Sequence, residues 1–197
     1  MYADNLLVGK GLKLIFISQI LSVISNFMAE GLLSGLVDVA SVIVAMVGLY
    51  TAAPAHPKFR AAFRLNIALC ILGVIVAVLS VFQKAGVSLG LITVLLLAVA
   101  ILAVALGVWS VYLICTAAGE ILTANGYATL AAKGVTVWKL FLVTYAAVIV
   151  FMLLAMVPFL LVIAGILVIG TVVAMLVGGI LYMIFLYNAY HALLYGQ

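Results

Sequence analysis

The residues of this chain best suited to chemistry lie in an apolar run near its N-terminus, where the stretch ISQILSVISN is unusually polar. Gln19, Ser22 and Asn26 are spaced at i, i+3 and i+7. Ser18 and Ser25 adjoin them, and on a helix this spacing places all five side chains on one face. Amides and hydroxyls hydrogen-bond either a solute or a neighbouring helix. The pattern therefore leaves two interpretations open, a solute path or binding cleft and interhelical hydrogen bonding.

Other polar residues within the apolar segments are few. Asn66 is a candidate for the same polar interior, and Thr144 and Tyr145 join it if they face the same side. Asp38 and Glu120 stand near segment ends, and no charged residue stands at the middle of a segment. Because intramembrane proton relays are built from carboxylates and histidines, we expect none here.

Motifs for catalysis and for metal binding are missing from the sequence. It holds no H-E-x-x-H, no G-x-S-x-G, no D-x-x-D pair and no Gly-rich phosphate loop. His56 and His191 are expected at the membrane boundary rather than in a site. Cys70 and Cys115 lie in apolar runs without metal-ligand spacing. We therefore expect both cysteine side chains to be buried and to pack as small hydrophobic residues. The sequence predicts a protein that is not an enzyme and that uses no cofactor.

Composition indicates which elements position these residues. Of the 197 residues, 71% are hydrophobic and 6% are charged, whereas soluble domains are about half apolar and about a quarter charged. No Asp, Glu, Lys or Arg occurs between Leu140 and Tyr190, and a helix needs only about 20 apolar residues to cross a membrane. The apolar runs are continuous rather than alternating, which favours helices over barrel strands. We therefore predict an integral membrane protein of the all-α class.

Six apolar segments predict a polytopic membrane helical bundle with a single transmembrane domain over residues 1–197. The expected spans are 11–29, 35–54, 62–82, 88–118, 137–157 and 161–189. The longest internal break is GEILTANGYATLAAKGVT, between the fourth and fifth spans. No charge marks the last turn. We expect it at Pro158, which removes a backbone donor, with Gly165 as the alternative.

The cations divide the breaks between two sides of the membrane. Seven of the eight lie at the N-terminus or around the second and fourth breaks, whereas Lys84 lies on the other side with Glu30 and Asp38. Cytoplasmic loops are enriched in Lys and Arg, so we expect a multi-pass protein of the cell membrane with both termini in the cytoplasm. The candidate cytoplasmic basic rim, which suits anionic lipid headgroups, consists of Lys13, Lys58, Arg60, Arg64 and Lys139.

The stretch LYTAAPAHPKFRAAF, from Leu49 to Phe63, is expected to be a joint between two spans, with a binding site as the alternative. Its Thr-Ala-Ala recurs at Thr116, and each odd-numbered span opens with a cation followed by leucine. These recurrences favour three consecutive helical hairpins related by an internal repeat. The competing interpretation is that a membrane boundary selects such residues without any repeat.

Small residues at four-residue spacing recur in several spans and are typical of close helix packing. We expect packing seams within one bundle, with a homodimer interface as the alternative, at Ser41, Ala45, Gly73, Ala77, Ala103, Gly107, Gly170, Ala174 and Gly178. Aromatic residues near segment ends predict a belt at the lipid headgroups. That belt comprises Tyr50, Trp138, Tyr182, Tyr187, Tyr190 and Tyr195.

The combination of GLKLIFISQIL, GLYTAAPAHPKFRAAF and KGVTVWK resembles small six-helix integral membrane proteins of anaerobic Gram-positive bacteria, an uncharacterised group. The resemblance extends over most of the chain. It implies a membrane bundle in a bacterial cell membrane, and it implies no activity, ligand or catalytic residue.

The sequence therefore favours a non-enzymatic bundle that acts as a structural protein, an accessory subunit or a lipid-interacting protein. The alternative is a small-solute transporter or channel whose polar path follows the first span. The expected partners are membrane lipids, with a second copy of the chain or another membrane protein as further candidates. We expect no nucleic acid, because the cations follow the topology of the chain.

Overall fold

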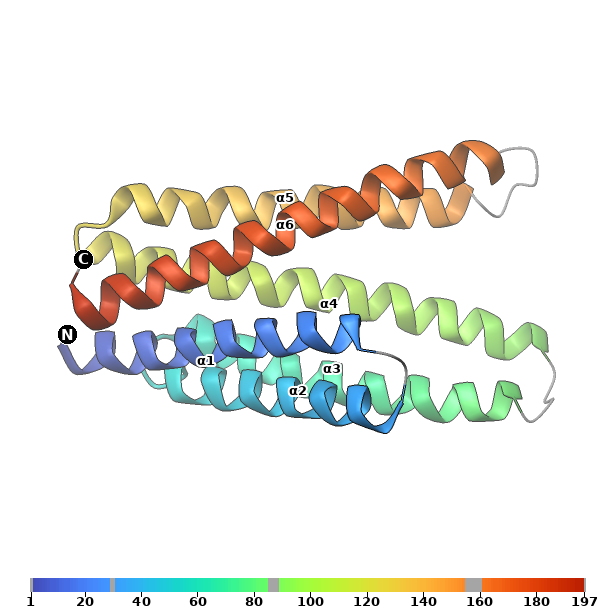
Figure 1. The fold of residues 1–197 in the computed structure, drawn as a ribbon, viewed down its shortest axis with the longest axis horizontal. Coiled ribbons are helices and arrows are strands. Elements are labelled where there is room, and N and C mark those ends of the chain that lie inside the picture. The colour runs from blue at the N-terminus through green and yellow to red at the C-terminus, as the bar shows by residue number, and fades with distance from the viewer. Residues whose placement is uncertain (1, 29–30, 85–88, 155–160, 197) are drawn as a thin grey trace.

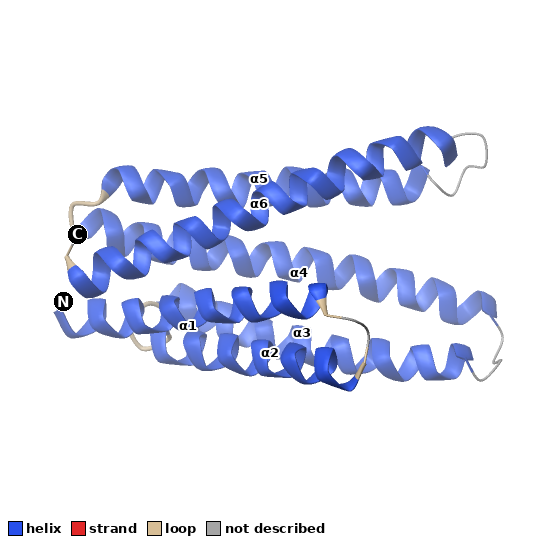
Figure 2. Cartoon of the chain, viewed as in Figure 1, coloured by secondary structure: helices blue, strands red, loops and turns tan. Residues whose placement is uncertain are grey.

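The computed structural model describes residues 2–28, 31–84, 89–154 and 161–196, and this part of the chain forms six helices and no strand (Figure 1, Figure 2). The helices are α1 (Tyr2–Phe27), α2 (Leu32–Ala52), α3 (Pro57–Lys84), α4 (Leu89–Ala124), α5 (Ala128–Leu154) and α6 (Leu161–Tyr195). All six are long and apolar enough to cross a membrane. The predicted all-α class and six membrane helices are confirmed, and the chain has the architecture of a multi-pass membrane protein.

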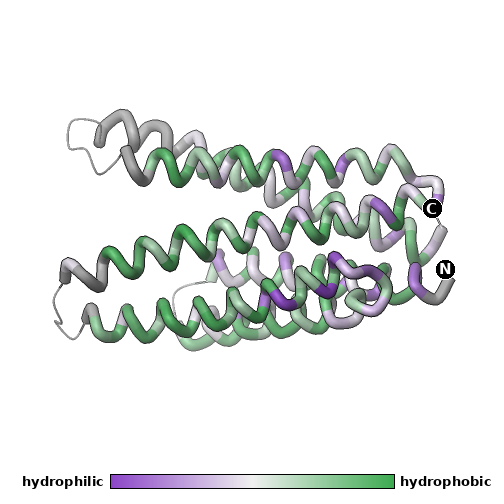
Figure 3. The backbone as a smooth tube through the Cα atoms, turned by 180° about the vertical axis from the view of Figure 1, so that it is seen from behind, coloured by the Kyte–Doolittle hydropathy of each residue, from purple (hydrophilic) through white to green (hydrophobic). Residues whose placement is uncertain are grey.

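The helices form a ring in chain order. Each helix packs against the next one, and α6 packs against α1 to close the ring. Both termini and the α2–α3 and α4–α5 connections lie at one end of the bundle, the terminal end, and the opposite end is the far end (Figure 1). Figure 3 shows the hydrophilic residues gathered toward the terminal end.

Five of the six helices are longer than the predicted spans at the terminal end, and α2 ends at Ala52, two residues before its predicted end. α1 begins at Tyr2, and α6 continues to Tyr195. The break expected over residues 119–136 is helical except for a short turn at residues 125–127. Ala, Leu, Glu and Lys favour helices outside the membrane as well. Falling hydropathy therefore marked the end of the apolar stretch rather than the end of the helix.

The turn between α4 and α5 is set by Gly126, whose φ of 88° lies in the left-handed region. Its N–H donates to the Thr123 carbonyl at 3.0 Å, and the Tyr127 N–H donates to the Leu122 carbonyl at 2.8 Å. This pair of bonds is the Schellman motif, which ends a helix and favours glycine at this position.

The predicted turn at Pro158 lies outside the described residues. α5 ends at Leu154 and α6 begins at Leu161. Gly165, the alternative, lies within α6 and does not form a turn.

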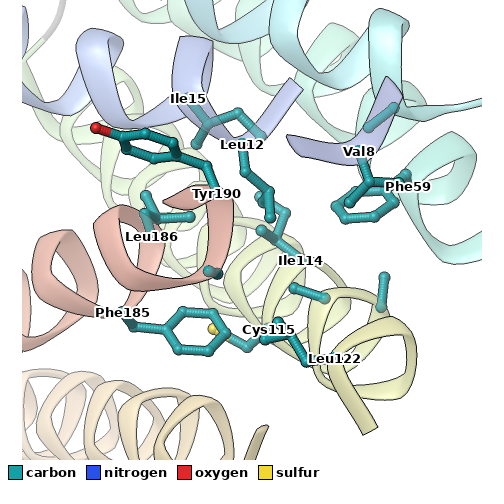
Figure 4. Packing of buried hydrophobic residues seen from close by; sticks show 14 of the residues in the cluster. Val8, Leu12, Ile15, Phe59, Ile114, Cys115, Leu122, Phe185, Leu186 and Tyr190 are labelled. Atoms are coloured by element: carbon teal, nitrogen blue, oxygen red, sulfur yellow. The ribbon is translucent and has the colours of Figure 1, made fainter. Parts of the chain in front are cut away.

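The buried core fills the terminal half of the ring. Side chains of α1, α4 and α6 meet there, among them Leu12, Ile114 and Leu186 (Figure 4). Beside this core, Gly11 and Gly48 let α1 and α2 approach closely, since a Cβ on Gly11 would stand 2.6 Å from the Gly48 carbonyl oxygen. Helices in lipid associate through such packing, because lipid is as apolar as the side chains and no hydrophobic effect drives them together.

Candidate functional site

A central cavity of about 450 Å³ lies inside the ring beside the core, within the usual range for small-molecule sites of about 300–1,000 Å³. Every helix contributes to its walls, and one lining residue from each, in chain order, is Gln19, Ala45, Asn66, Gly107, Tyr145 and Tyr182. None of the described residues that line it carries a charge. The cavity therefore combines an apolar wall with a few neutral hydrogen-bonding groups.

A second cavity, the α1–α3 cavity, has a volume of about 1090 Å³ and is lined by α1, α2 and α3. Four residues line both cavities: Gln19, Ala45, Asn66 and Leu69. Ser22 and Asp38 line the α1–α3 cavity farther along toward the far end. The central cavity thus continues toward the far end beside α1.

The polar face predicted on α1 is divided between two environments. Ser18, Gln19 and Ser22 line the cavities. The Ser25 hydroxyl is instead buried and donates to the Ser34 carbonyl of α2 at 3.1 Å. One part of the face therefore borders open space, and another part holds two helices together.

Asn26 does not face the interior as predicted. Its side chain is exposed, and its amide donates to the Ser22 carbonyl at 2.8 Å. The reason is that α2 covers only one side of the last turn of α1, the side of Ser25, whereas Asn26 and the 86% exposed Phe27 lie on the uncovered side.

Asn66 lies on the cavity wall and links α3 to α4. Its amide donates to the Ala62 carbonyl at 2.9 Å and to the Ser110 hydroxyl at 2.7 Å. Sequence reasoning missed Ser110. The signal was available, because Ser110 is the one serine or threonine between Thr93 and Thr116.

Three polar groups of the central cavity make no hydrogen bond in the described part of the chain: the Gln19 amide and the Tyr145 and Tyr182 hydroxyls. Tyr182 is 4% exposed, and its ring packs edge-on against Phe141 with centroids 5.8 Å apart. Among the described residues, no buried side-chain nitrogen or oxygen lacks a hydrogen-bond partner, so these polar atoms reach the open space of the cavity instead of being sealed in the core. The Gln19 amide and the Tyr182 hydroxyl are therefore suited to bond a molecule inside the cavity, and Tyr145 lies on its wall.

The prediction that Tyr182 belongs to the headgroup belt is wrong. It lies thirteen residues before the end of α6 at Tyr195, which places it about 20 Å deeper at a rise of 1.5 Å per residue. Tyr187 and Tyr195, nearer that end, are 44% and 59% exposed. Depth along the helix separates Tyr182 from Tyr187 and Tyr195, but Tyr190, also predicted to belong to the belt, is buried at 8% exposure although it lies near the helix end.

Most of the small residues predicted to form packing seams border space instead. A Cβ on Gly73, Gly107 or Gly170 would have no heavy atom within 4 Å. Gly178 does pack, since its Cβ would stand 3.7 Å from Leu140 and from Phe141. The seam residues that line at least one of the two cavities are Ser41, Ala45, Gly73, Ala77, Ala103 and Gly107.

The five residues of the predicted basic rim lie in the terminal half. Four of them have exposed side chains: Lys13, Arg60, Arg64 and Lys139. Lys58 is half-buried and donates to Glu120, which also pairs with His56 Nε2 at 3.0 Å. This cluster ties the α2–α3 joint to α4, and sequence reasoning could not place together residues 62 positions apart.

Amide hydrogen bonds add a second tie at the terminal end. Asn5 Nδ2 donates to Asn125 Oδ1 at 2.6 Å, and Asn125 Nδ2 donates to Asn5 Oδ1 at 3.1 Å. These bonds join α1 to the α4–α5 turn across the ring. The terminal end is therefore held together by polar contacts as well as by the core.

Comparisons of this chain with protein-family models, with curated proteins and with solved structures found no match. The resemblance to small membrane proteins of anaerobic bacteria stays a prediction.

Proposed function

We propose that this chain is a non-enzymatic membrane protein that binds a small uncharged molecule in the central cavity, on a solute path beside α1. The observation that carries the proposal is a single cavity lined by all six helices, in which the Gln19 amide and the Tyr182 hydroxyl have no hydrogen-bond partner among the described residues. This favours a solute-binding protein over a bundle that only packs.

The lining of the cavity supports an uncharged ligand. A charged molecule would lose its hydration there without gaining a counter-charge from the lining residues, which is expensive in an apolar site. A neutral molecule with a hydroxyl, carbonyl or amide group instead gains hydrogen bonds from Gln19 and Tyr182.

The test uses the purified chain in phosphatidylcholine liposomes and a diazirine-bearing hexanol as the photolabelling probe. We expect saturable labelling of the peptides that contain Gln19 and Tyr182. Gln19→Leu and Tyr182→Phe each remove one hydrogen bond, worth about 1 kcal/mol, so the apparent affinity falls about fivefold. Asn26→Leu is the matched control, because it removes an exposed amide outside both cavities.

Two outcomes would contradict the proposed binding and favour a bundle whose helices only pack together. One is labelling of these peptides that does not saturate with probe concentration. The other is an equal loss of affinity in Asn26→Leu and Gln19→Leu, which would mean that the cavity is not the binding site.

We also propose that the six helices are three hairpins related by an internal repeat. The Thr51 and Thr116 hydroxyls each donate to the carbonyl four residues earlier, at 2.7 Å. The similar stretches LYTAA, ICTAA and LYNAY lie at or near the ends of the even-numbered helices. The last two residues of each stretch are buried: Ala52 and Ala53, Ala117 and Ala118, and Ala189 and Tyr190. Membrane boundaries alone do not require this shared burial, so it supports a repeat.

We propose that the terminal end faces the cytoplasm of a bacterial cell, on the basis of its cations. Single cysteines at Leu33 and Lys133, in a chain lacking Cys70 and Cys115, test this with a membrane-impermeant maleimide on intact cells. We expect Leu33→Cys to be labelled and Lys133→Cys to be protected until the cells are opened. Labelling of both from outside would contradict the orientation.

Membrane lipids are the proposed partners of the basic rim. Its four exposed cations form no ion pair in the described part of the chain, which leaves them available to anionic headgroups. Vesicles of phosphatidylcholine with and without phosphatidylglycerol test this. The thermal stability of the chain is expected to rise with the anionic lipid, and less so in the Arg60→Gln, Arg64→Gln double variant.

A further inference from the structure

A third space lies on the outer side of the ring between α4 and α5. This α4–α5 groove has a volume of about 580 Å³. Trp109 and Leu142, which line it, are 59% and 49% exposed. Both residues lie well inside helices that are apolar enough to span the membrane, so the groove opens to the hydrocarbon of the bilayer.

The groove and the central cavity share part of their walls. Val104 and Val108 of α4 and Tyr145 of α5 line both spaces. Tyr145 stacks on Phe141 with ring centroids 5.9 Å apart. Gly107, which precedes Val108, has no side chain to add to the wall of the central cavity. A single layer of side chains therefore separates the bilayer from the interior of the ring.

The two spaces differ in chemistry. The groove is lined by aliphatic and aromatic groups, and one side holds the edge-on pair Tyr112 and Trp138, with centroids 5.0 Å apart. The central cavity offers the Gln19 amide and the Tyr182 hydroxyl. No described residue that lines either space is charged. Together they fit a molecule with a neutral polar head and an apolar tail.

We propose that the α4–α5 groove is a lateral portal through which an uncharged, single-chain amphiphile passes from the bilayer into the central cavity. Its hydroxyl or carbonyl head bonds Gln19 and Tyr182, and its chain lies in the groove beside Trp109. Tyr145 forms the wall that the chain crosses. This inference rests on the proposed function and names the class of ligand for that same site.

The experiment uses two photoactivatable hexadecanols in phosphatidylcholine liposomes, one with the diazirine beside the hydroxyl and one with it near the chain end. The head-proximal probe is expected to label the peptides of Gln19 and Tyr182. The tail-proximal probe is expected to label the groove residues Ala146 and Trp109, and excess unlabelled hexadecanol is expected to suppress both by at least fivefold.

A variant that fills the groove with a larger side chain tests whether the chain of the amphiphile lies there. Ala146→Phe places a ring in the groove, and the competable labelling by the tail-proximal probe should fall at least fivefold. Val143→Phe is the control, since it adds a ring on a face of α5 that is 67% exposed and does not line the groove. Both variants are compared at matched helical content.

The possible outcomes distinguish failure of the portal proposal from failure of the proposed binding in the central cavity. Competable head labelling of the cavity without competable tail labelling of the groove overturns the portal and leaves the proposed function standing. Equal losses in Ala146→Phe and Val143→Phe also overturn the portal. Absence of saturable labelling in the cavity overturns the proposed function itself, and with it the portal.

Discussion

The two halves of this bundle use the same residue type in opposite ways. In the terminal half, Gly11 and Gly48 bring α1 and α2 so close that a Cβ would collide with backbone. Around the cavities, Gly73 and Gly107 have nothing within 4 Å of a Cβ position. Small residues at helical spacing therefore mark either a contact or a space, and only the neighbouring helix decides which.

The largest effect should come from placing a side chain at the helix contact. Gly11→Leu forces apart backbones that have no room to shift, so we expect a loss of at least about 3 kcal/mol of folding free energy. Gly107→Leu adds the same side chain to open space and should leave thermal unfolding in detergent almost unchanged. It should also weaken hexanol labelling of the cavity about tenfold or more. Equal destabilisation by both variants would contradict the distinction between contact and space.

A smaller effect is expected from truncating the core. Leu186 is 0% exposed and Leu176, on the same helix, is 62% exposed. Leu186→Ala removes packing contacts that lipid does not replace, and we expect a loss of about 2 kcal/mol. Leu176→Ala exchanges contacts with lipid and should cost less than about 0.5 kcal/mol. Thermal unfolding of the two variants in the same detergent makes the comparison, and a reversed order would place the core elsewhere.

The two native cysteines provide a further comparison between the packed core and the region around the cavities. Both cysteines were predicted to be buried; Cys115 is buried in the core, but Cys70 is exposed and lines the α1–α3 cavity, so the prediction is wrong for Cys70. Maleimide reacts with the thiolate, which requires water. We therefore expect N-ethylmaleimide to modify Cys70 at least tenfold faster than Cys115, as followed by mass spectrometry, and both equally in denaturing detergent. A Cys70 that resists modification until denaturation would show that the α1–α3 cavity holds no water.

The smallest effect is expected from the ion cluster at the terminal end. The Glu120 side chain is 53% exposed, and exposed ion pairs contribute about 0.2–1 kcal/mol. Glu120→Gln should lower stability by no more than that, and a double-mutant cycle with Lys58→Met isolates the pair. A loss above about 2 kcal/mol would mean that the polar cluster, rather than the apolar core, holds this end together.

The sequence was sufficient for the class and number of helices, because long uncharged runs have one structural solution in lipid. It was also informative about the first helix, where the spacing of Ser18, Gln19 and Ser22 marks residues that now border the cavities. The helix ends were less predictable, because hydropathy falls before the helix stops; the signal for the α4–α5 turn was Asn125-Gly126.

The site itself could be anticipated only in part. Whether Gln19 faces space or a neighbour depends on how α1 sits against α3, and no local pattern encodes that distance. The pairing of Glu120 with His56 and Lys58 joins distant parts of the chain. Tyr182 lies in the interior because it is deep in α6. The other tyrosines near the end of that helix led to the incorrect prediction that Tyr182 lies at the headgroups.

Closure of the ring by α6 against α1 also sets the order of assembly during synthesis. Phe16 of α1 packs against Tyr187 and Tyr190 of α6, with ring centroids 5.7 and 5.8 Å apart. The ribosome makes α1 before α6, and chains acquire structure as they emerge. Within the described part of the chain, α1 therefore packs extensively against α2 alone until α6 has been synthesised. A chain truncated before α6 should be left with an unfinished wall, and quality-control proteases of the membrane should remove it.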